Sequence, residues 1–189
     1  HKTICSGIYI ASVLLCSAIK GSFSNTYTLL FIAAFMALFI HDIIEENGNK
    51  ISNIFSALLA VIGYIAMGIA LCYKNPTLFS ENEFGLIIQY AIPVAILLIC
   101  AITLIKSAPV SQLIATVYLI ICAILTGITL QNSGNPQSQA CSCAVIMGAS
   151  ALFISNIISV FDKSNAKSLL RINLYYFGLM FISCSVAVI

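Results

Sequence analysis

The sequence predicts an all-α fold, a multi-pass transmembrane helix bundle with seven helices in this chain. Of its 189 residues, 61% are hydrophobic and only 7% are charged, whereas a soluble domain carries roughly 25% charged residues. The mean hydropathy is +1.08. A chain of this composition cannot cover a globule with a solvated surface, so we expect a lipid bilayer to surround it. Its apolar residues also fall into runs of about the length that spans a bilayer.

Seven apolar runs follow one another along the chain. Cutting the sequence at charges and turn residues gives candidate helices at residues 3–19, 26–44, 51–73, 85–105, 109–130, 137–161 and 169–189. The segments between them read KGSFSN, EENGNK, YKNPTLFSENE, KSAP, QNSGNPQSQ and DKSNAKS, which are rich in polar and turn-forming residues. Because these segments are short, we expect consecutive helices to pack antiparallel within a single transmembrane domain that covers residues 1–189.

Two of the polar segments carry signals for the start of a helix. Ser107 is a suitable N-cap, and Pro109 fits the first turn that follows, where a missing N–H costs nothing. Ser164, Asn165 or Ser168 offers an equivalent cap for the last helix.

The loop charges predict how the bundle lies in the membrane. Because the helices alternate in direction, one side receives the basic residues Lys2, Lys50, Lys106, Lys163, Lys167 and Arg171. The other side receives only Lys20 and Lys74. Short loops rich in Lys and Arg stay in the cytoplasm, which puts the six-charge side there and the C-terminus outside. A net charge of +2 without a basic stripe argues against nucleic acid as a partner.

The eight cysteines are distributed as packing residues. Nearly all of them lie inside apolar runs, where cysteine behaves as a small hydrophobe. Cys141 and Cys143 form a C-x-C pair with no histidine ligands after it, which is a weak metal or redox motif. We therefore expect no metal ion and no other cofactor.

Acidic side chains gather at the end of the second candidate helix, in the segment FIHDIIEENGNK. Asp42, Glu45 and Glu46 are spaced i, i+3 and i+4 and therefore share one helical face. The helix macrodipole and their mutual repulsion favour a protonated carboxyl, which is the form that a general acid needs. The alternative is an ordinary solvated helix end.

Polar residues of four helices lie at a similar depth on the side with six basic charges. At 1.5 Å per residue, Asn156 sits roughly 9 Å inside the boundary, and Tyr175 and Tyr176 sit roughly 6–8 Å inside it. Asp42 lies at a comparable depth, and Ser111–Gln112 opens the fifth helix on the same side. The opposite halves of these helices offer little beyond Ser, Thr and Cys. This asymmetry indicates a functional site in one leaflet.

Other interpretations of the same residues stay open. Tyrosines near a membrane interface are commonly anchors at the level of the headgroups. Ser155 and Asn156 are also suited to hydrogen-bonding between helices. The basic residues around this end either hold a lipid phosphate or only determine the topology.

The last two candidate helices carry small, aromatic and polar residues at fixed spacing, in the segment MGASALFISNIISVFDKSN and its continuation LYYFGLMFIS. This pattern resembles the YhhN or lysoplasmalogenase family of multi-pass membrane proteins. That family has a Gly-Ala-x-x-x-Phe-x-Ser-(Asp or Asn) helix followed by a last helix that opens on Tyr. The matching positions are Gly148, Ala149, Phe153, Ser155, Asn156 and Tyr176.

Three earlier positions follow the family in part. Asp42 keeps the Asp of a Gly-Asp pair at a helix end, with His41 in place of the Gly. Tyr64 fits the Tyr of a His-x-x-Tyr motif, but Val61 stands where the His would be. Lys2 lies at about the place of a Lys-Pro pair, without the Pro. The register covers nearly the whole chain and implies one more helix before it, for eight in the full-length protein.

The resemblance implies an enzyme that hydrolyses the vinyl-ether bond of a lysoplasmalogen, a lysophospholipid, to a fatty aldehyde and a glycerophospho-headgroup. It implies Asp42 and Asn156 as catalytic residues and Tyr175, Tyr176, Ser155 and Lys2 as substrate-binding residues. Ile, Asn and Lys usage indicates a low-GC genome, so we expect a bacterial cytoplasmic membrane with the mouth of the site toward the cytoplasm.

Other functional classes make different demands on the sequence. A retinal protein needs a lysine for its Schiff base, and residues 169–189 contain none. A transporter or channel should carry polar positions across both leaflets, whereas they gather in one. The alternative that we keep is a non-catalytic membrane scaffold or lipid-binding subunit of a larger assembly.

Overall fold

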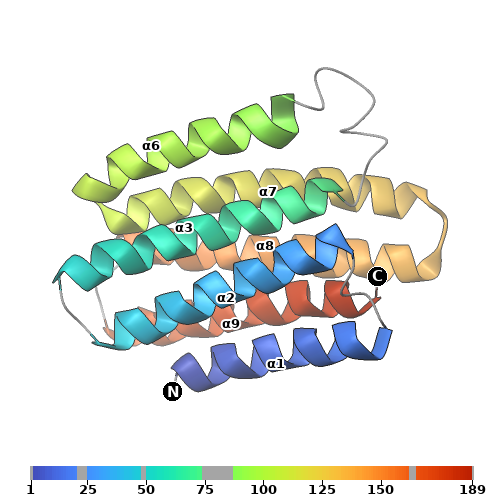
Figure 1. Ribbon diagram of the computed structural model, residues 1–189, viewed down its shortest axis with the longest axis horizontal. Coiled ribbons are helices and arrows are strands. Elements are labelled where there is room, and N and C mark those ends of the chain that lie inside the picture. Colours follow the sequence, from blue (N-terminus) through green and yellow to red (C-terminus); the bar gives the residue numbers. More distant parts are fainter. Residues whose placement is uncertain (1, 21–24, 48–49, 74–86, 162–164, 189) are drawn as a thin grey trace.

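The computed structural model describes residues 2–20, 25–47, 50–73, 87–161 and 165–188. Within these ranges every regular element is a helix and no strand occurs. The predicted all-α helix bundle is therefore confirmed, and its helices lie side by side along the long axis of the molecule (Figure 1).

Each predicted apolar run corresponds to helical structure. The helices are α1 (Lys2–Lys20), α2 (Thr26–Asn47), α3 (Lys50–Tyr73), α6 (Ile92–Lys106), α7 (Ala108–Asn132), α8 (Pro136–Phe161) and α9 (Asn165–Val188). Helix α9 begins at Asn165 rather than at residue 169, and α6 begins at Ile92, inside the run predicted from residue 85. Ser107 is the N-cap of α7 with Pro109 in its first turn, as expected.

The fourth run differs from a single α-helix. Its start is a short π-helix, η2 (Ile87–Ala91), which leads directly into α6. Pro93 therefore lies in the first turn of α6, where no intrahelical hydrogen bond is lost. The helical run therefore continues through this proline, with a change of helix type just before it.

Four helices are long and apolar enough to cross a membrane by length and composition. They run over Thr26–Glu45, Asn53–Tyr73, Ala108–Asn132 and Pro136–Phe161. Shorter apolar helices cover Thr3–Ile19, Ile92–Lys106 and Leu169–Ser185. Helices of this kind are compatible with an integral membrane protein.

Consecutive helices run in opposite directions, so helix ends from the whole chain meet at one end of the bundle. This end contains the starts of α1, α3, α7 and α9 and the ends of α2, α6 and α8, on the left in Figure 1. Helix α1 forms one edge of the bundle and α6 the opposite edge. We call the shared end the N-terminal end of the bundle because α1 begins there.

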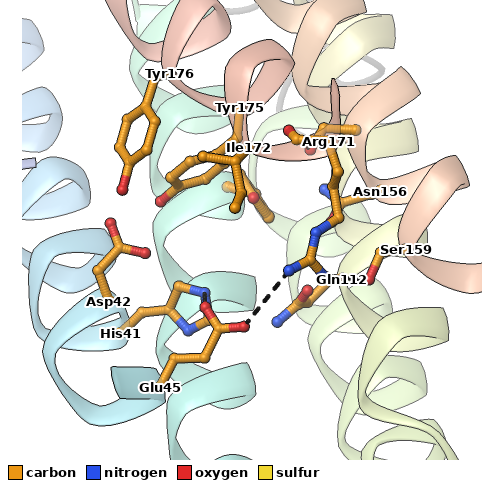
Figure 2. A pocket seen from close by; sticks show the side chains of 12 residues that line it. His41, Asp42, Glu45, Gln112, Asn156, Ser159, Arg171, Ile172, Tyr175 and Tyr176 are labelled. Carbon is orange, nitrogen blue, oxygen red and sulfur yellow. Dashed lines mark hydrogen bonds and ion pairs between the residues drawn. The ribbon is translucent and has the colours of Figure 1, made fainter. Parts of the chain in front are cut away.

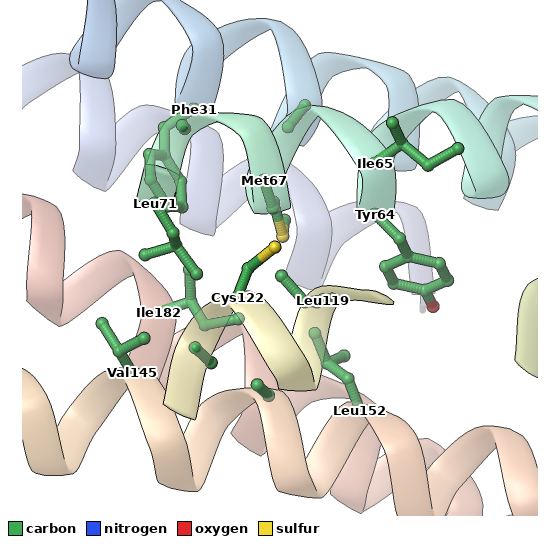
Figure 3. Close-up of a cluster of buried hydrophobic side chains, with 14 of the residues drawn as sticks. Phe31, Tyr64, Ile65, Met67, Leu71, Leu119, Cys122, Val145, Leu152 and Ile182 are labelled. Atoms are coloured by element: carbon green, nitrogen blue, oxygen red, sulfur yellow. The ribbon is translucent and has the colours of Figure 1, made fainter. Parts of the chain in front are cut away.

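The core between the helices is mainly apolar, with buried Ser and Thr side chains among its hydrophobic residues. Figure 3 shows side chains from α2, α3, α7, α8 and α9 meeting there, among them Phe31, Met67, Leu71, Leu119, Val145 and Ile182. Four cysteines are buried as free thiols, and the Sγ atoms of Cys72 and Cys122 lie 3.6 Å apart. Among the buried residues of the described chain, His41 and Asp42 are the ionisable exceptions outside Cys and Tyr.

Two glycines bring α8 and α9 into close contact. A Cβ atom on Gly148 would lie 2.9 Å from the carbonyl oxygen of Gly178, and the reciprocal distance from Gly178 to the Gly148 carbonyl is the same. Side chains larger than hydrogen would hold the two backbones apart. The glycines thus let the end of α8, which carries Asn156, approach the start of α9, which carries Arg171.

Candidate active site

A cavity of about 50 Å³ lies near the N-terminal end of the bundle. Twelve residues from five helices line it: His41, Asp42, Glu45, Tyr64, Gln112, Ser155, Asn156, Ser159, Arg171, Ile172, Tyr175 and Tyr176 (Figure 2). A water molecule needs a cavity of roughly 10–15 Å³ by this kind of measure. The space is therefore large enough for several waters or for part of a ligand.

Asp42 supplies the most deeply buried carboxylate of the cavity wall. The residue is 1% exposed, and its Oδ2 accepts a hydrogen bond from the hydroxyl of Ser6 on α1. Figure 2 shows the hydroxyl groups of Tyr175 and Tyr176 pointing toward this carboxylate. A buried carboxylate is stable only where donors surround it, and the Ser6 hydroxyl of α1 is one such donor.

His41 has its proton position determined by α3. Its Nδ1 lies 2.9 Å from the carbonyl oxygen of Ser56 and 2.6 Å from the Ser56 hydroxyl. A carbonyl oxygen can only accept, so Nδ1 carries a proton and donates it there. The other ring nitrogen, Nε2, faces Oε2 of Glu45 at 3.8 Å. His41 thus joins α2 to α3 and presents Nε2 toward the Glu45 carboxylate.

The trio of Ser56, His41 and Glu45 has the composition of a nucleophilic triad but not its geometry. In such a triad the serine oxygen faces the substrate and passes its proton to histidine. Here the Ser56 hydroxyl donates to the carbonyl oxygen of His41 at 3.0 Å. Ser56 is 2% exposed and is absent from the cavity lining. We therefore assign Ser56 to packing between α2 and α3.

Helix α8 forms the opposite wall with two adjacent polar residues in different roles. The Ser155 hydroxyl donates to the backbone carbonyl of Arg171 at 2.9 Å, so it joins α8 to α9 as interhelical hydrogen bonds do. Asn156 is 6% exposed, and its Nδ2 has no hydrogen-bond partner among the described residues. Of the two, Asn156 is therefore the residue with a donor to offer a ligand.

Two phenol groups, like the amide Nδ2 of Asn156, lack a hydrogen-bond partner among the described residues. The hydroxyls of Tyr175 and Tyr176 are buried and make no hydrogen bond that meets normal geometry within the described chain. Leaving a buried polar group unpaired costs about 1–3 kcal/mol, so such groups usually have water or a ligand as partner. Three donors that line one cavity indicate that it accommodates water or a ligand rich in acceptor oxygens.

Arg171 brings a positive charge to the mouth of the cavity. Its Nη1 donates to the hydroxyl of Ser159 at 3.2 Å, and its Nη2 lies 4.0 Å from Oε1 of Glu45. The Arg171 and Glu45 side chains are about a third exposed, at 32% and 37%. The polar wall therefore leads from the buried Asp42 to solvent along this pair.

His41, Asp42 and Glu45 also have the residue types of a metal site. Their potential ligand atoms lie within 4.8 Å of one another. The guanidinium of Arg171 already stands against Glu45, however, and a fixed positive charge opposes a second cation at close range. We therefore assign no metal to this group.

Five of the six residues singled out by the sequence line the cavity together. They are Asp42, Ser155, Asn156, Tyr175 and Tyr176. The sixth, Lys2, is the first residue of α1, and its side chain lies outside the described part of the structure, as does that of Glu46. Gln112 lines the cavity, whereas Ser111 turns its hydroxyl to the carbonyl of Ala108 at 2.7 Å.

Sequence reasoning missed two contributors to the site. Ser159 lies three residues after Asn156 and so shares its helical face, a signal that was available. Ser6 is one of several serines in an apolar helix, and nothing in the sequence distinguishes it from the others. Its contact with Asp42 depends on how α1 packs against α2.

Comparison with protein-family models, with curated proteins and with solved structures gives no match for this chain. The resemblance of the last two helices to the lysoplasmalogenase pattern therefore remains a prediction.

Proposed function

We propose that this chain is a membrane hydrolase of the lysoplasmalogenase type. It cleaves the vinyl-ether bond of a lysoplasmalogen and releases a fatty aldehyde and a glycerophospho-headgroup. The observation that carries the proposal is Asp42, a carboxyl 1% exposed in the wall of a water-sized cavity with unpaired donors opposite. The spacing match at Gly148, Phe153 and Asn156 supports the same assignment.

The reaction needs few components. A proton adds to the β-carbon of the vinyl ether, and the positive charge is shared by the α-carbon and the ether oxygen. Water then attacks the α-carbon and loses a proton, which gives a hemiacetal. The hemiacetal collapses to the aldehyde and returns the glycerol oxygen as a hydroxyl. One water is consumed, the catalytic proton is restored, and no nucleophilic side chain is needed.

Asp42 delivers the proton in this scheme and its carboxylate then takes one from the attacking water. Positioned acid and base groups of this kind contribute about 10²–10⁴-fold to rates. Asn156 orients the water or an ether oxygen through its free Nδ2. Tyr175 and Tyr176 hydrogen-bond to the carboxyl or the water from the α9 side, consistent with the directions of their hydroxyls in Figure 2.

The position of the cavity suits a substrate that is held by a membrane. A lysolipid keeps its single chain among apolar surfaces and its polar end at the interface. Asp42 and Asn156 lie near the ends of apolar helices, and the cavity opens beside Arg171 and Glu45, which are partly exposed. The six basic residues predicted on this side support an orientation with the mouth toward the cytoplasm of a bacterial cell.

Aldehyde release from purified protein tests the proposal. The full chain is incubated with a lysoplasmalogen, and a saturated 1-alkyl lysolipid serves as the substrate control. Asp42→Asn keeps the volume of the side chain but cannot deliver the proton, so we expect a loss of at least about 100-fold. Ser142→Ala is the matched control, because it removes a buried hydrogen bond to the Gly127 carbonyl far from the cavity.

The outcome separates the enzyme from the alternative class. Full activity of folded Asp42→Asn would exclude Asp42 as the acid. A wild-type protein without turnover that copurifies with stoichiometric partners would favour a scaffold or lipid-binding subunit instead.

A further inference from the structure

Arg171 is held by two long contacts at the mouth of the cavity. Its Nη1 donates to Ser159 at 3.2 Å, at the long end of the hydrogen-bond range. Its Nη2 lies 4.0 Å from Oε1 of Glu45, which is an ion pair without a hydrogen bond. A partly exposed pair of this kind contributes little to stability, so a better anion can take the place of Glu45.

The groups around Arg171 are suited to such an anion. A guanidinium offers five N–H donors in a planar fork, of which the described residues use few. Asn156 contributes the unpaired Nδ2 from the same wall of the cavity. An amide NH₂ has two hydrogens, so one can bond a phosphate oxygen while the other orients the water. The Ser159 hydroxyl lies within reach of the guanidinium on the adjacent helix. Phosphate oxygens match the spacing of a guanidinium fork and form two parallel bonds with it.

We propose that Arg171, together with Ser159 and Asn156, binds a phosphate group, whose oxygens displace the Glu45 carboxylate from the guanidinium. This inference rests on the proposed function, since it names the part of the cavity that holds the phosphate of the lysolipid. In a lysoplasmalogen the ether oxygen and the phosphate lie at the two ends of glycerol. A phosphate site must therefore belong to the same cavity as Asp42 and lie nearer solvent, which is where Arg171 stands.

Glu45 acts as a competitor in this arrangement. Its carboxylate and the phosphate seek the same guanidinium, so the charge of Glu45 weakens phosphate binding. Removal of that charge should tighten binding, whereas removal of the Arg171 charge should weaken it. Opposite effects from two facing residues are a signature that general damage to the fold cannot produce.

Equilibrium binding without turnover tests the inference. The full chain, in detergent micelles, is titrated with a saturated 1-alkyl lysophospholipid, which has no vinyl ether to hydrolyse. We expect Arg171→Gln to weaken binding about 10- to 100-fold and Arg171→Lys to weaken it less. Glu45→Gln should strengthen it. A 1-alkylglycerol without phosphate should bind equally to the wild type and to all three variants.

A second arm identifies the source of the phosphate. Inorganic phosphate is titrated alone and in competition with the lysophospholipid. Competition that is lost in Arg171→Gln supports the site for the lipid headgroup. Binding of inorganic phosphate at Arg171 without any effect on the lipid would mean that the site takes free phosphate, which overturns the headgroup assignment.

The remaining outcomes distinguish this inference from the hydrolase. If lysophospholipid and alkylglycerol bind equally and neither Arg171→Gln nor Glu45→Gln changes this, the phosphate site is wrong. If binding depends on phosphate and on Arg171 but no aldehyde is ever released, the phosphate site is supported and the hydrolase function is refuted. If a 1-alkenylglycerol is hydrolysed at the same rate as the lysoplasmalogen, the hydrolase function is supported and the phosphate site is refuted. If Arg171→Gln fails to fold, the Glu45→Gln variant tests the phosphate site alone: tighter lysophospholipid binding supports the site, and unchanged binding refutes it.

Discussion

The hydroxyl of Ser6 on α1 donates a hydrogen bond to Oδ2 of Asp42 on α2. Both residues are buried, at 3% and 1% exposure, among apolar helices. Helix α1 lies at the edge of the bundle, and none of its described side chains lines the cavity. Among the described residues, α1 supports the site through this bond, which orients the carboxyl, and through Tyr9, whose ring stacks on that of Tyr176 with 6.1 Å between the ring centroids.

Ser6→Ala should therefore impair catalysis, although Ser6 itself does not contact the substrate. A hydrogen bond to a charged group contributes about 1.5–3 kcal/mol, and loss of orientation at Asp42 should reduce kcat about 10-fold or more. KM should remain unchanged, because Ser6 does not line the cavity. Steady-state kinetics of aldehyde release measure both, and Ser6→Thr should restore most of kcat by returning the hydroxyl.

Ser17→Ala provides the matched control for this variant. Ser17 is also buried on α1, but its hydroxyl donates to the Val13 carbonyl of its own helix at 2.8 Å. We expect kcat to stay within about twofold of the wild type, since surface and remote changes seldom alter chemistry. Equal losses in Ser17→Ala and Ser6→Ala would show that α1 acts only through stability.

Ser56→Ala distinguishes acid catalysis from a serine nucleophile. The variant loses the bond from the Ser56 hydroxyl to the His41 carbonyl, so its unfolding temperature should fall, in line with a cost of about 1–3 kcal/mol. Aldehyde release from the folded protein should be retained, because the hydroxyl does not face the cavity. A loss of about 1,000-fold or more, as expected for a triad serine, would contradict the proposed chemistry.

Asn156→Leu should separate stability from activity. The two side chains have the same number of heavy atoms, branched at Cγ, and the substitution removes a buried donor whose desolvation costs about 1–3 kcal/mol. We expect an unfolding temperature equal to or above that of the wild type. Aldehyde release should fall at least about 10-fold, because nothing then orients the water. Thermal unfolding in detergent and the turnover assay measure the two effects.

The neighbouring residue, Ser155, should show the opposite effects on stability and activity. Ser155→Ala removes the hydroxyl that bonds to the Arg171 carbonyl, so the unfolding temperature should fall. Most of the activity should survive in the protein that stays folded. If Asn156→Leu destabilises the bundle as Ser155→Ala does, Asn156 is a packing residue and not part of the water site.

The helices were predictable because lipid imposes a simple rule on the sequence. A span takes about 20 apolar residues and ends where polar residues meet water, so the bounds of α2, α3 and α7 agree with expectation within a few residues. The π-helix before α6 was not predictable, since the choice between i+4 and i+5 bonding leaves no clear trace in an apolar segment.

The sequence predicts how deep in the bundle the site residues lie, but not which face of each helix turns toward the site. Short connections align the helix ends, so counting residues from the boundary placed Asp42, Asn156 and Tyr175 at one level. Which face of each helix turns inward depends on packing with its neighbours. Ser111 and Gln112 were therefore equivalent in the sequence, yet only Gln112 lines the cavity.

The contact between Gly148 and Gly178 should be needed for both stability and activity. In Gly148→Ala the new Cβ would meet the Gly178 carbonyl at 2.9 Å and Cγ1 of Ile182 at 2.6 Å. Backbone cannot yield as a side chain does, so α8 and α9 must separate and carry Asn156 away from Arg171. We expect a lower unfolding temperature, in line with about 1–3 kcal/mol for overpacking, and slower aldehyde release.

Gly7→Ala is the control for this variant. Among the described residues its Cβ meets Phe39, at an ordinary 3.6 Å, and alanine favours a helix by about 0.5–1 kcal/mol. Loss of stability in both variants alike would mean that close contact between α8 and α9 is not what Gly148 provides.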